Sequence, residues 1–173
     1  FESRPSADFT VDKRWPLLRS DEQARWRRNL TPRTLEDVSL SVLRWKTSCR
    51  IVRTMNAAGL PILAGTDTPM PLVYPGYAMH DELELLVACG LSNAKALQAA
   101  TINPARALKL ENTVGSVDIG KRADLVLLDS DPLQDIRNSR DIHAVVLDGK
   151  LLGHEDLDKL ITVYGTNQKS GTK

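Results

Sequence analysis

The longest regular pattern of apolar positions lies between Thr34 and Gly59. Apolar residues recur there at intervals of three and four, which places them along one face of a helix. Thr34 can cap this helix, with Asp37 at its third position, and Gly59 stands where a left-handed residue often follows a helix end. We therefore predict a helix over residues 35–58, with an apolar stripe made of Leu35, Val38, Val42, Trp45, Cys49 and Val52.

A short apolar run, Ile62 to Ala64, follows this helix and ends in Gly65-Thr66-Asp67. Such a run, bounded by small and polar residues, is typical of a buried parallel strand. Parallel α/β folds place functional groups at the carboxyl ends of their strands, so Asp67 is the first candidate site residue. The alternative is that Asp67 only forms a turn or caps a helix.

Shorter helices are expected next, after a loop over residues 69–79 that is rich in proline, glycine and tyrosine. Residues 80–89 carry an apolar pattern of helical period. Ser92 can cap a second helix that continues to Ala100, and Asn103 can cap a third, directly before a proline.

Beyond Asn112 the pattern changes to that of β structure. The pair Asp148-Gly149, between two apolar runs, is a strong signal for a tight hairpin. Helices with an intervening strand, followed by several strands, imply a parallel α/β part and then a separate β part. The strand candidates are Val114–Ile119, Ala123–Leu128, Ile142–Leu147 and Leu151–Leu152.

Both ends of the chain lack such patterns. Residues 1–34 hold eight Lys and Arg against five Asp and Glu, a local charge of +3, and are expected to form an irregular connection. Trp26 lies among arginines and could stack on nucleic acid; the favoured alternative is a loop or short helix with Trp26 packed against the body. The last twenty residues are polar and are expected to form a frayed tail.

Composition narrows the classes of protein. With 42% apolar residues, 26% charged residues and a net charge of +1, the chain is typical of a globular protein that does not bind polyanions. No apolar run reaches the roughly 18 residues of a membrane helix.

Two cysteines cannot build a disulfide framework, so we expect Cys49 and Cys89 to pack as small apolar side chains, with a reactive thiol as the alternative. The chain starts at Phe1, so a signal peptide could precede it, and the working expectation is a cytoplasmic location.

A series of short motifs follows Asp67 and its flanking residues in a fixed order. In this order and spacing, the chain from Thr34 to Leu152 resembles the C-terminal part of the metal-dependent amidohydrolase superfamily, in its imidazolonepropionase-like and prolidase-like branch. The motifs are Ala64–Asp67, His80–Leu83, Gly90–Ser92, Ala96–Ala105, Gly115–Asp129, Asp131–Leu133 and Val146–Lys150.

The resemblance implies an α/β chain: the C-terminal fragment of a (β/α)8 TIM-type barrel and part of a small composite β-sandwich. Residues 1–34 would connect, residues 35–113 would hold the last barrel strand and its flanking helices, residues 114–152 would supply sandwich strands, and residues 153–173 would be a tail. The remaining barrel and sandwich strands would then precede this chain. We therefore expect an unpaired sheet edge in the β part.

The resemblance also implies roles for individual residues. Asp67 would end the eighth strand, ligate a divalent metal, most simply one or two zinc ions, and relay a proton. His80 would touch substrate or brace the loop, and the favoured alternative is a structural histidine hydrogen-bonded near a helix start. Tyr74 and Tyr77 would line the mouth or pack locally. His143 and His154 are expected to be structural or solvated.

The superfamily's other metal ligands, a His-x-His pair on the first strand and histidines on the fifth and sixth strands, have no counterpart here. All three histidines of this chain follow Asp67 in sequence, so those ligands would lie outside the chain, which we expect to be inactive on its own.

The expected function is therefore that of a hydrolase acting on a C–N bond of a small molecule, either a cyclic amide or a dipeptide-like amide, with a metal-activated water. Two alternatives stay open: a deaminase of the same superfamily and a noncatalytic interaction module. We expect neither a nucleic-acid nor a membrane partner, and the full-length enzyme could be a homo-oligomer.

Overall fold

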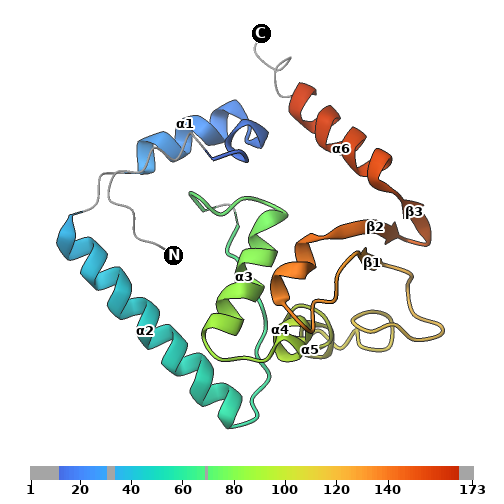
Figure 1. The fold of residues 1–173 in the computed structure, drawn as a ribbon, viewed down its shortest axis with the longest axis horizontal. Coiled ribbons are helices and arrows are strands. Elements are labelled where there is room, and N and C mark those ends of the chain that lie inside the picture. The colour runs from blue at the N-terminus through green and yellow to red at the C-terminus, as the bar shows by residue number, and fades with distance from the viewer. Residues whose placement is uncertain (1–11, 31–33, 69, 168–173) are drawn as a thin grey trace.

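A computed structural model describes residues 12–30, 34–68 and 70–167. Figure 1 shows short helices at the centre, a long helix along one side and a small sheet along the other. None of the helices in the described ranges is both long and apolar enough to cross a membrane. In chain order the elements are η2 (Trp15–Leu17), α1 (Ser20–Asn29), α2 (Leu35–Ala57), α3 (Tyr77–Ala88), α4 (Asn93–Ala100), α5 (Ile102–Ala107), β1 (Leu125–Leu128), η3 (Ile136–Arg140), β2 (Ile142–Leu147), β3 (Lys150–Leu152) and α6 (His154–Asn167).

Helix α2 confirms the longest predicted helix and both of its end signals. The Asp37 N–H donates to Thr34 Oγ1 at 3.1 Å, and the Thr34 N–H donates to Asp37 Oδ2 at 2.8 Å, which forms a capping box. Gly59 follows the helix with a φ of 70°. The apolar stripe, however, is only partly covered: Leu35 is 83% exposed, Val52 is half-buried, and Cys49 is the only buried residue of α2.

The segment Ile62–Ala64 is not a strand, which corrects the prediction. A strand exists only through pairing, and no other strand of the described chain lies beside this segment. Its backbone bonds to helices instead: the Ala64 N–H donates to the Ala99 carbonyl at 2.8 Å, and Asn103 Nδ2 donates to the Ile62 carbonyl at 2.9 Å.

A cluster of buried side chains forms the core beneath this segment. Helices α3 and α4, the turn between them and η3 supply it, and Ile62 and Ala64 pack against it. The two alternate positions thus face the core while Leu63 between them is exposed, the alternation expected of an extended segment. The cluster consists of Leu83, Leu86, Leu91, Ala96, Ala99 and Ile136.

Of the two caps predicted for the shorter helices, one is confirmed. Ser92 caps α4, since its Oγ accepts from the Lys95 N–H at 3.3 Å. Asn103 does not cap the next helix: α5 begins at Ile102 without a side-chain cap, so Asn103 lies inside the helix, where its Nδ2 donates to the Ile62 carbonyl. Helix α3 begins at Tyr77, three residues earlier than the pattern indicated.

The predicted strand Val114–Ile119 is wrong, because this stretch turns against α5. Gly115 has a φ of 93°, and a Cβ at this position would lie 2.6 Å from the Ala105 Cβ. Glycine alone fits both the backbone conformation and the close approach. The Lys121-Arg122 pair lies at the bend that precedes β1.

The three strands form one antiparallel sheet in the order β1-β2-β3. Val145 pairs with Val126 of β1 on one side and with Leu152 of β3 on the other. Asp148 and Gly149 both have positive φ, 49° and 80°, which fits a type I′ hairpin and confirms that prediction. Among the described strands β1 and β3 have no second partner, so the expected unpaired edge is confirmed.

Both ends of the chain hold helices. Ser20–Asn29 forms α1, which corrects the irregular connection in this part of residues 1–34 but agrees with the favoured alternative of a short helix. Trp26 on α1 is 1% exposed, so it packs against the body, as that alternative expected. His154–Asn167 forms α6, which corrects the frayed tail for those residues, with Glu155 and Asp156 favourably placed in its first turn. The basic end of the chain, residues 169–173, lies outside the described residues.

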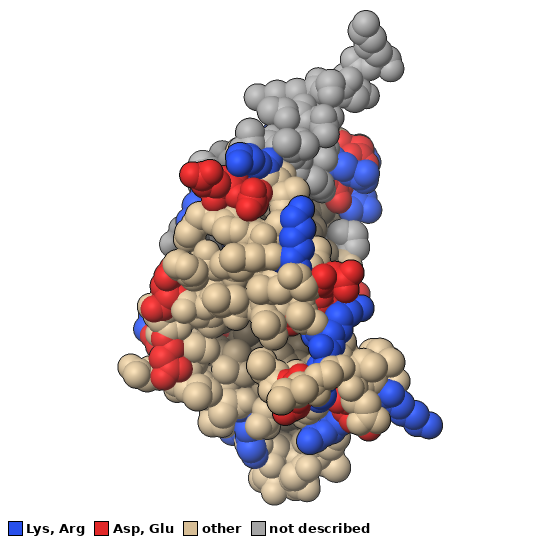
Figure 2. All heavy atoms as spheres, turned by 90° about the vertical axis from the view of Figure 1, so that its right-hand side faces the viewer, with Lys and Arg blue, Asp and Glu red and all other residues tan. Residues whose placement is uncertain are grey.

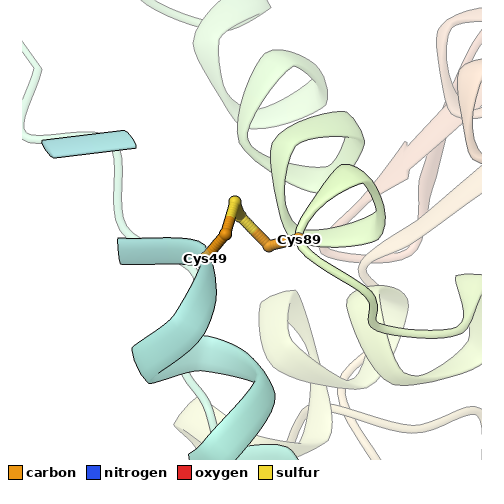
Figure 3. Close-up of a disulfide and its surroundings, with 2 residues drawn as sticks. All are labelled: Cys49 and Cys89. Atoms are coloured by element: carbon orange, nitrogen blue, oxygen red, sulfur yellow. A yellow bond between two sulfur atoms is a disulfide. The ribbon is translucent and has the colours of Figure 1, made fainter. Parts of the chain in front are cut away.

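The two cysteines are buried, as predicted, but they are bonded to each other rather than packed as free thiols. Figure 3 shows the bond between Cys49 on α2 and Cys89 at the C-terminal end of α3. Their Cα atoms are 4.5 Å apart, within the range that a disulfide spans. No sequence signal marks a single pair at a separation of 40 residues.

Candidate functional site

Asp67 lies directly after the extended segment, in a left-handed backbone conformation with a φ of 53°. This region is sparsely populated by residues other than glycine, although aspartate tolerates it better than most. The turn leaves Asp67 exposed, and the Thr66 and Thr68 hydroxyls bond to each other beside it at 2.8 Å. The carboxylate is therefore held at the end of an anchored segment and open to a ligand.

Glu82 of α3 contacts the turn that carries Asp67, a contact that the sequence analysis did not single out. The Gly65 N–H donates to Glu82 Oε1 at 3.5 Å. Burial raises the pKa of Glu82, and the Gly65 N–H partly offsets this because it favours the charged form. The one available signal was the position of Glu82 inside the His80–Leu83 motif.

His80 contacts η3. Its Nδ1 lies 3.0 Å from the buried Ser139 hydroxyl, which ties α3 to η3. Burial lowers the pKa of His80, and the positive charge of Arg140 lowers it further, so the neutral imidazole is favoured. The contact agrees with the alternative favoured from the sequence, a structural histidine that is hydrogen-bonded near the start of a helix.

A network of charged side chains holds the N-terminal segment and η3 against α3. Asp81 pairs with Arg14 at 3.3 Å and also with Arg140, and Arg140 pairs with Glu84 at 2.7 Å. Arg14 in turn pairs with Asp12 at 2.8 Å, and this guanidinium lowers the pKa of the Asp12 carboxyl. Because the pairs are partly buried and share partners, they fix the relative positions of three segments around α3.

The loop that follows Asp67 is anchored by an aromatic cluster that the sequence reasoning missed. Tyr74 is 2% exposed, and its ring meets that of Trp26 edge-on, with the ring centroids 5.1 Å apart. The Arg14 guanidinium carbon lies 4.4 Å from the centroid of the Tyr74 ring. Burial raises the pKa of Tyr74 to about 12. Tyr74 thus packs locally rather than lining an open mouth, while Tyr77 lies partly buried beside the cluster.

The two remaining histidines lie at the sheet, where the sequence analysis expected structural or solvated roles. His143 Nδ1 lies 2.8 Å from Asp129 Oδ1, on the neighbouring part of the sheet. The ring of His143 meets that of His154 edge-on at 6.1 Å. Both side chains are exposed, and neither is brought to the Asp67 turn by a contact in the described chain.

The described residues contain no group of three or more His, Cys, Asp or Glu side chains that could hold a metal ion. A zinc site takes three or four ligands, so this part of the chain does not form a complete one. Asp67 offers one exposed carboxylate and fits a single place in a larger ligand set.

Comparison with known proteins gives matches along most of the chain. The amidohydrolase family pattern matches residues 17–152. An imidazolonepropionase from Symbiobacterium thermophilum is 43% identical over 79 residues, which cover 44% of this chain and 18% of that protein. A 5-methylthioadenosine/S-adenosylhomocysteine deaminase from Moorella thermoacetica is 31% identical over 120 residues, covering 58% of this chain and 28% of that protein.

Among solved structures, a putative prolidase from Bifidobacterium longum superposes with a TM-score of 0.54 and 39% identity, over 65% of this chain and 29% of that one. The chain thus spans less than a third of the length of each of these three proteins. Since the family pattern covers the chain from η2 to the end of β3, the chain belongs to the amidohydrolase family.

Proposed function

We propose that the full-length protein hydrolyses a C–N bond of a small molecule, a cyclic or dipeptide-like amide, and that Asp67 is its proton-transferring residue. The observation that carries this proposal is the Asp67 turn. An exposed carboxylate in a sparsely populated conformation ends a segment that two hydrogen bonds fix to α4 and α5. Backbone strain of this kind clusters at functional sites, where the surrounding structure maintains it.

The chemistry suits a carboxylate. A divalent cation such as zinc, held by Asp67 and by ligands from outside this chain, would acidify a water and polarise the scissile carbonyl. Asp67 can accept a proton from the attacking water on one Oδ and deliver it to the departing nitrogen, which leaves as an amine. The anchored segment holds the carboxylate in one orientation while the proton moves.

A deaminase is the second candidate, and the relative named as a deaminase supports it. The same carboxylate would hand its proton to an amidine nitrogen, and ammonia would leave instead of an amine. One assay separates the two candidates. The full-length protein, supplied with zinc, is incubated with cyclic amides, with dipeptides and with adenosine derivatives, and both ammonia and new carboxylate are measured.

The role of Asp67 is tested by Asp67→Asn in the full-length protein. The change keeps the shape of the side chain and removes its charge and basicity, so we expect kcat to fall by about 10²- to 10⁴-fold with little change in thermal stability. His143→Ala and His154→Ala are the matched controls and should keep kcat within a few-fold. If Asp67→Asn retains more than about a tenth of the wild-type kcat at saturating metal, Asp67 only forms a turn.

A noncatalytic module, the remaining alternative, predicts no turnover of any substrate in the panel and no bound metal. Metal analysis of the purified full-length protein tests this separately from activity. Stoichiometric zinc together with no turnover would point to an untested substrate. Absence of both would overturn the enzyme proposal.

A further inference from the structure

We infer that this protein folds in an oxidising compartment and carries the Cys49–Cys89 bond there as a permanent structural crosslink. The bond uses both cysteines of the chain. Disulfides persist in secreted, periplasmic and other oxidising environments, whereas the reducing systems of the cytosol remove them. The presence of the bond therefore bears on where the protein matures, and it argues against the cytoplasmic location expected from the sequence.

Burial makes this a structural bond rather than an exchanging one. Cys49 is 5% exposed and Cys89 is 3% exposed, and the bond between them lies between α2 and the end of α3 (Figure 3). Thiol–disulfide exchange requires a thiolate to reach a sulfur atom in line with the bond, so buried pairs react slowly. Exposed pairs are the ones that serve as labile or catalytic disulfides.

The bond lies where it can hold α2 against α3. Apart from Cys49, no side chain of α2 is buried, so apolar packing within the described chain secures this 23-residue helix poorly. A second close contact lies beside the bond, where the Arg53 Cγ approaches within 3.1 Å of the place of a Cβ on Gly90. The crosslink therefore holds α2 against α3 at a point where their backbones come close together.

The same bond encloses the candidate site. Helix α2 precedes the Ile62–Asp67 segment, and α3 follows it, so the two bonded residues flank this segment in the chain. The crosslink closes the loop that contains Asp67 and the contact between Gly65 and Glu82. Tying both helices restricts the positions that the Asp67 turn can adopt.

Formation of the bond is a two-electron oxidation of two thiols. The two thiols lose two protons and two electrons, and the electrons pass to an oxidant, which we take to be the disulfide of a thiol–disulfide oxidoreductase. One cysteine thiolate attacks that disulfide to give a mixed disulfide, and the second displaces the oxidoreductase. The oxidoreductase leaves as a dithiol, and Cys49 and Cys89 become linked.

The experiment traps the thiol state in the cells that naturally make the protein. Cells are quenched with acid, free thiols are blocked with a maleimide under denaturing conditions, and the protein is digested with trypsin without reductant. Trypsin cuts after Lys46, Arg50, Arg53 and Lys95. A crosslinked protein yields peptide 47–50 joined to peptide 54–95, whereas reduced protein yields the two peptides separately, each with a maleimide adduct.

We expect the joined peptides to account for nearly all of the protein, and maleimide adducts on both cysteines in native cells would overturn the inference. Cys49→Ser in the full-length protein calibrates the trap, because its unpaired Cys89 must take one adduct.

A thermal melt tests the structural role. The melting midpoint of oxidised wild type should fall by several degrees once reductant has opened the bond, whereas Cys49→Ala/Cys89→Ala should not respond. An unchanged wild-type midpoint after verified reduction would show that the bond holds nothing in place.

Discussion

At the scale of single residues, the Asp67 turn combines an exposed carboxylate with an anchored backbone. The neighbouring Gly65 N–H contacts Glu82, so α3 reaches the turn through one carboxylate. Asp67 stood out in the sequence because a polar residue directly follows an apolar run, whereas Glu82 did not, because nothing in a helical pattern tells which polar residue turns towards a neighbouring segment. Contacts between distant residues depend on how elements pack, and a local pattern does not contain that information.

Glu82 is expected to steady the turn through this contact. Glu82→Leu removes the acceptor and should speed the exchange of the Gly65 amide hydrogen in the full-length protein, while Glu82→Gln keeps an acceptor oxygen and should leave exchange close to wild type. Amide hydrogen exchange, followed by mass spectrometry of short acid-protease peptides that contain Gly65, measures this effect. Equal exchange in both variants would remove the positioning role.

His80 gives a prediction about pH. Burial, together with the charge of Arg140, makes the folded-state pKa lower than the value of 6.5 of an unperturbed histidine, while Asp81 and Glu84 act weakly in the opposite direction. A lowered pKa means that the unfolded chain binds the proton more readily. The contribution of neutral His80 to stability is therefore present above pH 6.5 and is lost as the pH falls through its lower folded-state pKa.

The melting temperature of the full-length protein should therefore fall more steeply below pH 6.5 for wild type than for His80→Gln, which has no titrating ring. His143→Gln, at an exposed position, controls for the loss of a histidine ring. Parallel profiles for wild type and His80→Gln would refute the assignment.

At the scale of elements, capping and turn signals were the most reliable predictors. Thr34 with Asp37, Ser92, and Asp148-Gly149 each specify a structure through contacts within a few residues, and all three behave as expected. The prediction of a strand at residues 62–64 was wrong because a strand depends on a distant contact: it needs a partner strand from elsewhere in the chain. Helix α6 was missed because a short amphipathic pattern in a polar stretch is hard to distinguish from a solvated tail.

The turn at Gly115 shows how a local pattern can mislead. The valines and isoleucine around it favour a strand, yet the backbone bends because Gly115 packs against Ala105. Gly115→Ala should lower the free energy of unfolding by about 1–3 kcal/mol, since a Cβ adds both backbone strain and a clash. Gly120→Ala is the matched control: Gly120 also has a positive φ, 87°, but no atom lies within 4 Å of the Cβ position.

Denaturant unfolding of the full-length protein measures both variants. The difference between them isolates the contact with Ala105, because the cost of the backbone conformation is shared. Equal losses would mean that the close approach is relieved by a small shift of α5.

At the scale of the whole molecule, this chain exposes surfaces that folded monomers usually cover. Large apolar side chains are exposed along α2 and along both outer strands of the sheet, including Leu43, Ile51, Val126 and Leu151. On the face seen in Figure 2, basic and acidic groups lie close to each other, which agrees with the near-neutral net charge of +1. Little electrostatic repulsion therefore opposes association through the apolar surfaces.

Residues 1–173 expressed alone should aggregate or behave as a loosely packed state. The open sheet edges and the partly exposed apolar face of α2 favour association, and the segment Ile62–Ala64 forms no ladder of hydrogen bonds with a strand of the described chain. Analytical ultracentrifugation and thermal melting test this. A monodisperse monomer with a sharp cooperative transition would be incompatible with the expectation.

The bond between Cys49 and Cys89 also changes the topology of the chain, since residues 49–89 form a closed covalent ring. Residues 70–76, a loop within that ring, contain no helix or strand. A protease that cuts the backbone once in this loop opens the ring but does not divide the molecule, because the two pieces stay joined through sulfur. Such a nicked protein would keep the mass of the intact chain, plus one water, until a reductant releases its two halves.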